Sequence, residues 1–471
     1  MTEHVVPALD ERRPLLGPAI VCLALALTGL PYLVLGSMGL YVVVYPVATA
    51  IIAVALYAVS RPAYVGFSMW VWFLTPLVRR LVDYGLGGYT ESSPAMLAPY
   101  LVGGIGALGL WAVLTTEARG ARQAFTLMLV ALVYGGAVGF VQNSASKLAE
   151  SAFEWGIPLV TGALVLVDWQ QYPRYRDVIL RTVTLGMGLL GLYGIYQFFV
   201  LPPWDRMWME SVHMISLGQP LPLQVRVFGT LNSPNPFAMT MVVGLLCLLA
   251  SGNRSRVEAL VARLATVPAA FALLLSTVRS GWGAYVVGLL YILFMARSQH
   301  RWRVLLFIAV MAAAVAPLAL DESVSGRLSD RAASFTDLSS DRSLNARADL
   351  YSMAATQLLY IPLGLGLGMP NLDSGLIETV ATLGWAGAAA YFLGFALLCL
   401  WAWRMRRRVP DHDPFIVVAM GIAVAMTATL PFGNSFTGVK GVYLFGFLAL
   451  ALAGIRYHAA ALVRGPVVAS G

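Results

Sequence analysis

The chain has 471 residues, of which 59% are hydrophobic and only 11% are charged, and its formal net charge is +8. Soluble domains carry about a quarter charged residues, so this composition excludes an ordinary soluble protein. The apolar runs are long and continuous, which excludes the short alternating segments of a transmembrane β-barrel. The sequence therefore predicts an all-α protein that crosses a membrane many times.

The apolar runs predict about twelve to fourteen transmembrane helices, at about 20 residues for each crossing. They lie near residues 16–35, 39–58, 62–80, 94–115, 124–141, 152–168, 178–199, 236–251, 264–278, 281–296, 304–319, 376–402, 415–431 and 438–456.

Two long polar connections interrupt these runs, at 200–235 and at 320–375. The second spans about 55 residues, far more than an ordinary connection. The predicted organisation is a tail at 1–15, a helical region at 16–319 that contains the first connection, the second connection, C-terminal helices at 376–456 and a tail at 457–471. No separate soluble domain is expected.

The short loops that carry most of the Lys and Arg residues predict the orientation, because such loops stay in the cytoplasm. Examples are Arg61, Arg176, Arg256 and Arg406. Both tails are then cytoplasmic, and both polar connections lie on the outer face. The net positive charge reflects this topology and does not indicate nucleic-acid binding. The outer face has no ATP, so an enzyme there needs an activated substrate that the membrane delivers.

The first outward segment of interest runs from Arg226 to Ala238. It contains a proline-rich turn with Asn232 and Asn235, which are residue types typical of turns. Arg226 stands beside a predicted bilayer helix with no acidic residue close in the sequence. The alternative is an ordinary helix-entry loop in which Asn235 is the N-cap.

The second segment contains Arg279 between two apolar runs, within Ser276–Trp282. This arginine is a candidate for anion binding on the outer face. The alternative is that its side chain snorkels to the lipid headgroups, with Trp282 in the interfacial aromatic belt.

The third segment, from Arg342 to Gly368, predicts an amphipathic helix that lies on the outer leaflet and ends at Pro362. A glycine-alternating turn follows it. Arg347 projects from the first turns of this helix. The alternative is that Arg347 is a solvated charge that pairs with Asp349 or Glu322.

The fourth segment contains Asp373 and Glu378, at the start of the next apolar run. Asp373 is either the N-cap of that helix or a functional carboxylate at the headgroup surface. Glu378 lies about one turn inside the run, where an ionisable residue is costly.

Together these segments bring arginines and a carboxylate to one membrane face. Arginine binds phosphate oxygens through two parallel hydrogen bonds, and a carboxylate can take a proton from a hydroxyl nucleophile. The combination favours transfer of a group from a lipid diphosphate to a sugar hydroxyl. The outward-facing acids do not form a metal-binding pattern, so a metal-independent reaction without a cofactor is expected.

The residues from Arg226 to about Gly387 resemble the superfamily of O-antigen ligases and O-antigen or exopolysaccharide polymerases. Arg226-Val-Phe-Gly-Thr230 with Asn235-Pro-Phe-Ala238 is similar to the Arg-hydrophobic-x-Gly-Thr…Asn-x-Phe-Ala stretch of this superfamily. Thr277-Val-Arg-Ser-Gly281 is similar to its Thr-x-Ser-Arg-Gly signature. Arg347-Ala-Asp-Leu-Tyr351 with Pro362-Leu-Gly-Leu-Gly366 is similar to its Arg-x-x-Leu-Trp…Pro-x-x-Gly-x-Gly segment.

One departure bears on the reaction. Ligases of this superfamily commonly carry His-Asn eleven residues before a Gly-x-x-Gly turn, and here Asp373-Ser374 stands eleven residues before Gly384-Trp-Ala-Gly387. The ligase histidine is therefore absent, and Asp373 takes its place. This form is more similar to the polymerases.

The resemblance implies a helical fold of the GT-C kind in the bacterial inner membrane, with its active site at the periplasmic face. It implies that a glycan is transferred from undecaprenyl diphosphate to the acceptor sugar of a new lipid-linked repeat unit. By matching position, the resemblance assigns the diphosphate contacts to Arg226, Arg279 and Arg347, with Arg342 beside them. It assigns the role near the acceptor hydroxyl to Asp373. The expected supporting residues are Asn232, Asn235, Tyr351 and Glu378. Expected partners are the lipid-linked donor and acceptor, membrane lipids, a chain-length regulator and a flippase.

Three alternatives to the polymerase remain. The nearest is an O-antigen ligase that transfers the glycan to the lipid A core. A flippase or another transporter of lipid-linked glycans also needs many spans and charged residues, but it more often shows inverted repeats and short outer loops. The third, a pore or structural subunit of an export complex, does not require convergent arginines.

Overall fold

The computed structural model describes residues 38–117, 119–250, 256–296, 301–302, 305, 309, 342–406 and 413–464. The side chains of residues 38, 116, 342–347, 355, 463 and 464 lie outside this description. So do the predicted spans at 16–35 and 304–319, apart from residues 305 and 309 in the second, and residues 320–341 of the predicted connection at 320–375.

Helices make up the described part of the chain, which contains no strand beyond an isolated antiparallel bridge between Gly218 and Val225. The first half contains α2 (Met38–Val59), α3 (Arg61–Gly85), η1 (Pro94–Leu97), α4 (Ala98–Gly104), α5 (Ala107–Thr116), α6 (Arg119–Gln142), α7 (Ala145–Val167), η2 (Trp169–Gln171) and α8 (Tyr172–Val200). The second half contains α9 (Pro203–Val212), η3 (Ile215–Leu217), α10 (Pro234–Leu248), α11 (Arg256–Leu275), α12 (Arg279–Met295), α15 (Arg342–Gln357), η4 (Leu358–Tyr360), α16 (Gly375–Arg406), α17 (Pro414–Ala428), η5 (Leu430–Phe432) and α18 (Gly438–Arg464).

Nine segments in the described ranges are long and apolar enough to cross a membrane. They are α2, the η1–α5 segment, α6, α7, the η2–α8 segment, α11, α16, the α17–η5 segment and α18. The predicted spans at 236–251 and 281–296 correspond to the shorter apolar helices α10 and α12. The span at 62–80 corresponds to α3, which carries Arg79, Arg80 and Asp83 near its end. The expected total of twelve to fourteen crossings stays a prediction.

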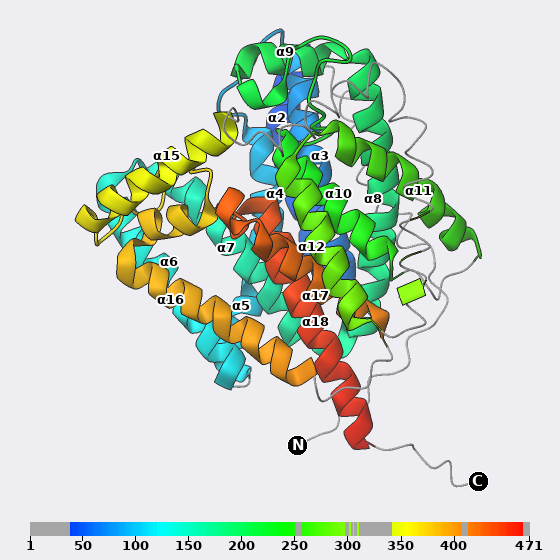
Figure 1. Ribbon diagram of the computed structural model, residues 1–471, viewed down its shortest axis with the longest axis vertical. Helices are drawn as coiled ribbons and strands as arrows, with labels where there is room; N and C mark the ends of the chain where they lie inside the picture. Colours follow the sequence, from blue (N-terminus) through cyan, green and yellow to red (C-terminus); the bar gives the residue numbers. More distant parts are fainter. Residues whose placement is uncertain are drawn as a thin grey trace.

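The helices run alternately between two ends of one bundle. At one end, named the α9 end, Arg80 near the end of α3 contacts Asp205 of α9, and the start of α10 contacts the start of α12. At the opposite end, Arg61 pairs with Asp168 and Arg456 pairs with Glu117. Figure 1 shows α9 and α15 near the upper end of the bundle and the end of α18 at the bottom. The described parts of both polar connections therefore belong to the same end.

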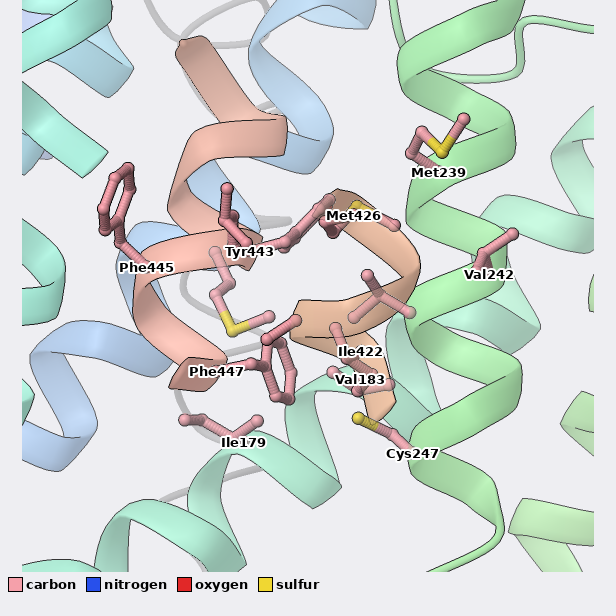
Figure 2. Packing of buried hydrophobic residues seen from close by; sticks show 14 of the residues in the cluster. Ile179, Val183, Met239, Val242, Cys247, Ile422, Met426, Tyr443, Phe445 and Phe447 are labelled. Atoms are coloured by element: carbon pink, nitrogen blue, oxygen red, sulfur yellow. The ribbon is translucent and has the colours of Figure 1, made fainter. Parts of the chain in front are cut away.

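The core between α8, α10, α17 and α18 is almost entirely apolar. Figure 2 shows Val183 of α8, Cys247 of α10, Ile422 of α17 and Tyr443 of α18 directed toward one another. The hydroxyl of Tyr443 lies 2.9 Å from that of Thr240 on α10, so its polar atom is hydrogen-bonded inside this core. Packing of this kind stabilises helix contacts in lipid, where the hydrophobic effect between helices is weak.

A kink at Gly384 divides α16. Gly384 has φ 64°, a left-handed value that glycine adopts without steric cost. A Cβ at this position would lie 2.5 Å from the carbonyl oxygen of Pro362. Leu365 N donates to Ala381 O and Gly366 N to Thr382 O, at 2.7 and 3.0 Å. The glycine-alternating segment, residues 364–368, thus packs against the kink. Its N–H groups donate hydrogen bonds to helix carbonyls that the kink leaves without a partner inside α16. Hydropathy predicted one span at 376–402 here, and only the family resemblance indicated a Gly-x-x-Gly turn at Gly384.

Several helix ends differ from the predicted span boundaries, and two of them are described here. The span expected at 264–278 is α11, which ends at Leu275, because Thr277 has φ 50° and breaks the helix before α12 starts at Arg279. The expected boundary at 456 lies inside α18, which continues to Arg464.

Candidate functional site

A buried ion pair connects α3 to α9. Arg80 Nε lies 3.0 Å from Asp205 Oδ1, and both side chains are fully buried. Asp205 also accepts hydrogen bonds from Gln197 Nε2 at 2.6 Å and from the hydroxyl of Tyr193 at 2.9 Å. Burial raises the pKa of the Asp205 carboxyl, and the Arg80 guanidinium acts in the opposite direction. A buried pair of this kind needs all of these partners, because each charge has lost its water.

The same network holds the backbone of the turn at 228–231. Arg80 donates to the carbonyls of Leu231 and Gly229, both at 2.6 Å. Gln197 Oε1 accepts from the N–H groups of Phe228 and Gly229, at 2.9 and 2.8 Å. Gly229 has φ 56°, and a Cβ there would lie 2.2 Å from the ring of Phe237. The backbone on the C-terminal side of Arg226 is therefore fixed from two sides.

Arg226 meets the segment that precedes α12. Its Nε donates to the Thr277 hydroxyl at 2.8 Å, and a terminal nitrogen donates to the Thr277 carbonyl at 3.3 Å. Arg279 follows two residues later, at the first position of α12, and is partly buried. The structure thus places the first and second predicted segments side by side. We name Arg226, Asn235, Thr277, Arg279 and Ser280 the arginine cluster.

The two predicted asparagines lie on this turn. Asn235 Nδ2 donates to Ser280 Oγ at 3.4 Å, and Asn232 Nδ2 lies 4.0 Å from the sulfur of Met96 in η1. The alternative in which Asn235 is an N-cap is wrong, because α10 begins at Pro234 and Ser233 is its N-cap. Asn235 is in the first turn of the helix.

The third predicted segment contacts the fourth through Tyr351 on α15. The Tyr351 hydroxyl donates to the Pro431 carbonyl at 3.0 Å and lies 2.9 Å from Ser374 Oγ. The predicted helix is present as α15, followed by η4. The backbones of Arg342 and Arg347 are in its first turns, but their side chains are outside the described residues.

Asp373 is exposed and does not cap α16. The capping residue is Ser374, which is fully buried and whose Oγ accepts from Ile377 N at 3.4 Å. The alternative reading of Asp373 as an N-cap is therefore wrong. Its carboxylate interacts electrostatically with Glu378 and Lys440.

Glu378 belongs to a second polar group at the α9 end. It is 3% exposed and accepts from Asn434 Nδ2 at 2.7 Å and from Leu372 N at 3.0 Å. Lys440 of α18 interacts electrostatically with Glu378, with Asp373 and with Glu154 of α7. We name these five residues (Glu154, Asp373, Glu378, Asn434 and Lys440) the carboxylate cluster.

Sequence reasoning missed several of these residues. Glu154 and Lys440 both lie inside predicted spans, so the cost of an ionisable residue in a bilayer, which singled out Glu378, indicates them equally. Arg80 and Asp205 gave a weaker signal, because they stand at a predicted span end and in a polar connection. No local pattern connects them.

The opposite end has a separate charged network. Asp413, the N-cap of α17, accepts from the Tyr172 hydroxyl at 2.8 Å and from Arg176 at 3.1 Å. His458 of α18 lies 3.5 Å from the same carboxylate. In the part of the chain that the structure describes, no group of three or more His, Cys, Asp or Glu side chains could hold a metal ion.

The helices and their apolar faces define a polytopic, all-helical, multi-pass membrane protein. The sequence matches no protein-family model, and the comparison with curated proteins gives no match.

Proposed function

We propose that the protein is a membrane-embedded glycosyltransferase that polymerises lipid-linked polysaccharide repeat units. The observation that carries the proposal is the contact of Arg226 with Thr277, which brings two arginine segments together at the end of the bundle that also holds the carboxylate cluster. Glycan transfer requires cationic groups that stabilise the departing donor diphosphate, and a carboxylate that takes the proton of the acceptor hydroxyl. The sequence resemblance to the O-antigen polymerase and ligase superfamily, with its GT-C kind of fold, supports the same reaction.

In this proposal Arg226 and Arg279 bind the diphosphate of the undecaprenyl carrier and stabilise its charge as the glycosidic bond breaks. The sequence prediction assigns Arg347 and Arg342 to the same diphosphate. Asp373 is exposed, so it is accessible to an acceptor hydroxyl and takes its proton. The bond from the anomeric carbon to the diphosphate oxygen breaks, and the bond to the acceptor oxygen forms.

The distribution of basic residues supports a site on the outer face. Arg61, Arg176, Arg406 and Arg456 all lie at the end opposite α9. Because short basic loops stay in the cytoplasm, that end is proposed to be cytoplasmic. The α9 end is then periplasmic, and the membrane is the bacterial inner membrane.

A transporter of lipid-linked glycans is the second candidate. Glu154, Glu378 and Lys440 lie within candidate spans and interact with one another. Charged groups inside spans are also typical of substrate pathways and proton relays. An O-antigen ligase is the nearest alternative within the glycosyltransferases, and it differs only in the acceptor.

The envelope glycan of a deletion strain tests the proposal. The strain is complemented with wild type, with Arg279→Ala, or with the control Arg174→Ala, an exposed arginine at the opposite end, at matched protein levels. We expect long chains with wild type and the control, and single repeat units with Arg279→Ala. Removing an arginine that stabilises charge in the transition state lowers the reaction rate by about 100-fold or more.

Other outcomes identify the alternatives. Long chains that accumulate on the carrier lipid but are missing from lipid A core indicate a ligase. Lipid-linked units that remain on the cytoplasmic leaflet indicate a transporter. Normal glycan in the deletion strain would exclude the polymerase, the ligase and the transporter.

A further inference from the structure

Residues 350–372 contain no charged residue and no histidine, although they belong to the polar connection predicted at 320–375. They form the end of α15, η4 and the segment that leads to α16. Three of their side chains are strongly exposed: Leu359 at 66%, Tyr360 at 86% and Leu363 at 65%. An exposed apolar surface on a segment without charge usually has a partner, because such a surface is unfavourable in water.

This stretch is hydrogen-bonded to α6. Leu367 N donates to Gly135 O at 2.9 Å. The hydroxyl of Tyr134 donates to Leu363 O at 3.0 Å, and Asn143, which follows α6 directly, donates from Nδ2 to Leu367 O at 3.0 Å. Leu363 and Leu367 therefore lie beside the last turns of α6, which is a candidate span.

The same stretch is also hydrogen-bonded to α16, another candidate span. Trp385 N donates to Pro362 O at 3.0 Å, and the indole Nε1 of Trp385 donates to Leu358 O at 2.9 Å. Two further N–H groups, those of Leu365 and Gly366, donate to the helix carbonyls named above. Non-helical backbone is tolerated at the depth of a bilayer only where protein or trapped water satisfies its polar groups. Here α6 and α16 provide the partners.

Glycines let this stretch approach both helices closely. A Cβ on Gly366 would overlap the backbone nitrogen of Gly139 in α6, and a Cβ on Gly364 would overlap that of Gly384 in α16. Small residues have the same role where helices pack in membranes. The glycines of this segment are thus buried between the two spans, whereas the exposed side chains before them remain on the outer surface of the pair.

The position of these contacts along α6 gives the depth of the stretch. Gly135 precedes Gln142, the last residue of α6, by seven residues. At about 1.5 Å per residue, Gly135 lies about 10 Å from that end of the helix. Because α6 has 24 residues and a crossing needs about 20, the end of α6 lies near the surface of the bilayer and Gly135 lies below it.

Exposed side chains of α6 continue the same surface. Val133, Phe140 and Val141 are each more than half exposed, and apolar side chains on the outside of a span face lipid. Figure 1 shows α6, α15 and α16 together on one side of the bundle. Tyr and Trp are typical of the zone where hydrocarbon meets the headgroups, which agrees with the exposed positions of Tyr360 and Trp385 at this depth.

We propose that residues 358–368 form a re-entrant segment: the chain leaves α15, dips into the leaflet at the α9 end and returns to the same surface before α16 begins. Leu359, Tyr360 and Leu363 contact the acyl chains of that leaflet. The segment thereby anchors α15 at the surface of the bilayer. Such a segment is compatible with a glycosyltransferase and with a transporter, because the contacts that support it do not involve the reaction.

Spin labels test the depth. Leu359→Cys, Tyr360→Cys and Leu363→Cys, each in a background without native cysteines, are labelled with a nitroxide and reconstituted in vesicles of phosphatidylethanolamine and phosphatidylglycerol. Collisions of the label with oxygen, which concentrates in hydrocarbon, are compared with collisions with a water-soluble nickel chelate. The lipid reference is Val133→Cys on α6, and the aqueous reference is Glu210→Cys on α9, where the native side chain is exposed. We expect the ratio of oxygen to nickel accessibility at the three positions to be several-fold higher than at Glu210→Cys and close to that at Val133→Cys.

Two results overturn the re-entrant segment. Nickel accessibility as high as at Glu210→Cys would place the stretch in water. Low accessibility to both reagents would show that protein covers the stretch, either a second copy of the chain or residues outside the described ranges.

Photocrosslinking tests the same contact without a substitution. Wild-type protein is reconstituted with a phospholipid that carries a diazirine on its acyl chain, irradiated and digested, and the lipid adducts are located by mass spectrometry. We expect adducts on the peptide that contains residues 358–368 and on the exposed face of α6. Adducts on α6 without any on residues 358–368 would contradict the lipid contact.

Discussion

Arg80 is fully buried, and its guanidinium contacts Asp205 and two backbone carbonyls. Asp205→Asn leaves this charge without a counterion. Because one unpaired buried charge costs about 3–5 kcal/mol, we expect a loss of that order in the free energy of unfolding. Denaturant titration in detergent micelles measures it.

The matched control is Glu258→Gln. Glu258 pairs with Arg181 at 3.0 Å, but both side chains are more than a third exposed. Exposed pairs contribute about 0–1 kcal/mol. Comparable losses in the two variants would show that the Arg80–Asp205 pair is not desolvated as the structure indicates.

At the residue scale, the sequence predicted isolated residues better than their partners. Glu378 was predictable, because an acid within an apolar run is costly in lipid. Its partner Asn434 was not, because Asn434 lies 56 positions along the chain. The same holds for Arg226, whose partner Thr277 is 51 positions away. Hydrogen bonds between distant segments depend on tertiary packing, which periodicity does not encode.

At the element scale, the kink of α16 carries a testable consequence. Gly384→Ala forces a side chain into a left-handed backbone position and against the carbonyl oxygen of Pro362. Strain of this kind costs about 1–3 kcal/mol. We expect a lower melting temperature and faster proteolysis within 358–368, where the glycine-alternating segment is displaced from α16.

Gly156→Ala is the matched control for this variant. Gly156 is inside α7, and no atom lies within 4 Å of an added Cβ. Alanine is favoured over glycine in a helix, so the control is expected to be neutral or slightly more stable. Unchanged proteolysis in Gly384→Ala would contradict the role given to the kink.

The element boundaries show where sequence patterns fail. The predicted helix at the start of the third segment is present as α15, and Pro362 follows η4 as expected. Hydropathy did not predict the kink at Gly384, because one glycine does not interrupt an apolar run, and only the resemblance indicated a Gly-x-x-Gly turn there. The break between α11 and α12 was predicted between residues 278 and 281, and the structure places it at Thr277, whose φ is 50° and whose hydroxyl accepts from Arg226.

At the scale of the whole molecule, the proposed function requires the α9 end to face the periplasm. Glu210 of α9 and Arg174 of α8 are exposed at opposite ends. In a background without native cysteines, an impermeant maleimide added to spheroplasts is expected to label Glu210→Cys and not Arg174→Cys. Lysed cells provide the control, because both positions should then react. Labelling of Arg174→Cys alone would reverse the orientation and remove the periplasmic site.

The carboxylate cluster also bears on how the protein is assembled during synthesis. Glu154, Glu378 and Lys440 come from α7, α16 and α18, which leave the ribosome far apart in time. A helix released into lipid with an unpaired ionisable group is poorly held there. Glu154 is therefore synthesised long before Lys440. Until α18 is made, retention of α7 in the membrane depends on neighbouring helices or on the insertion machinery. A ribosome stalled before α18 would leave Glu154 and Glu378 without the interaction with Lys440.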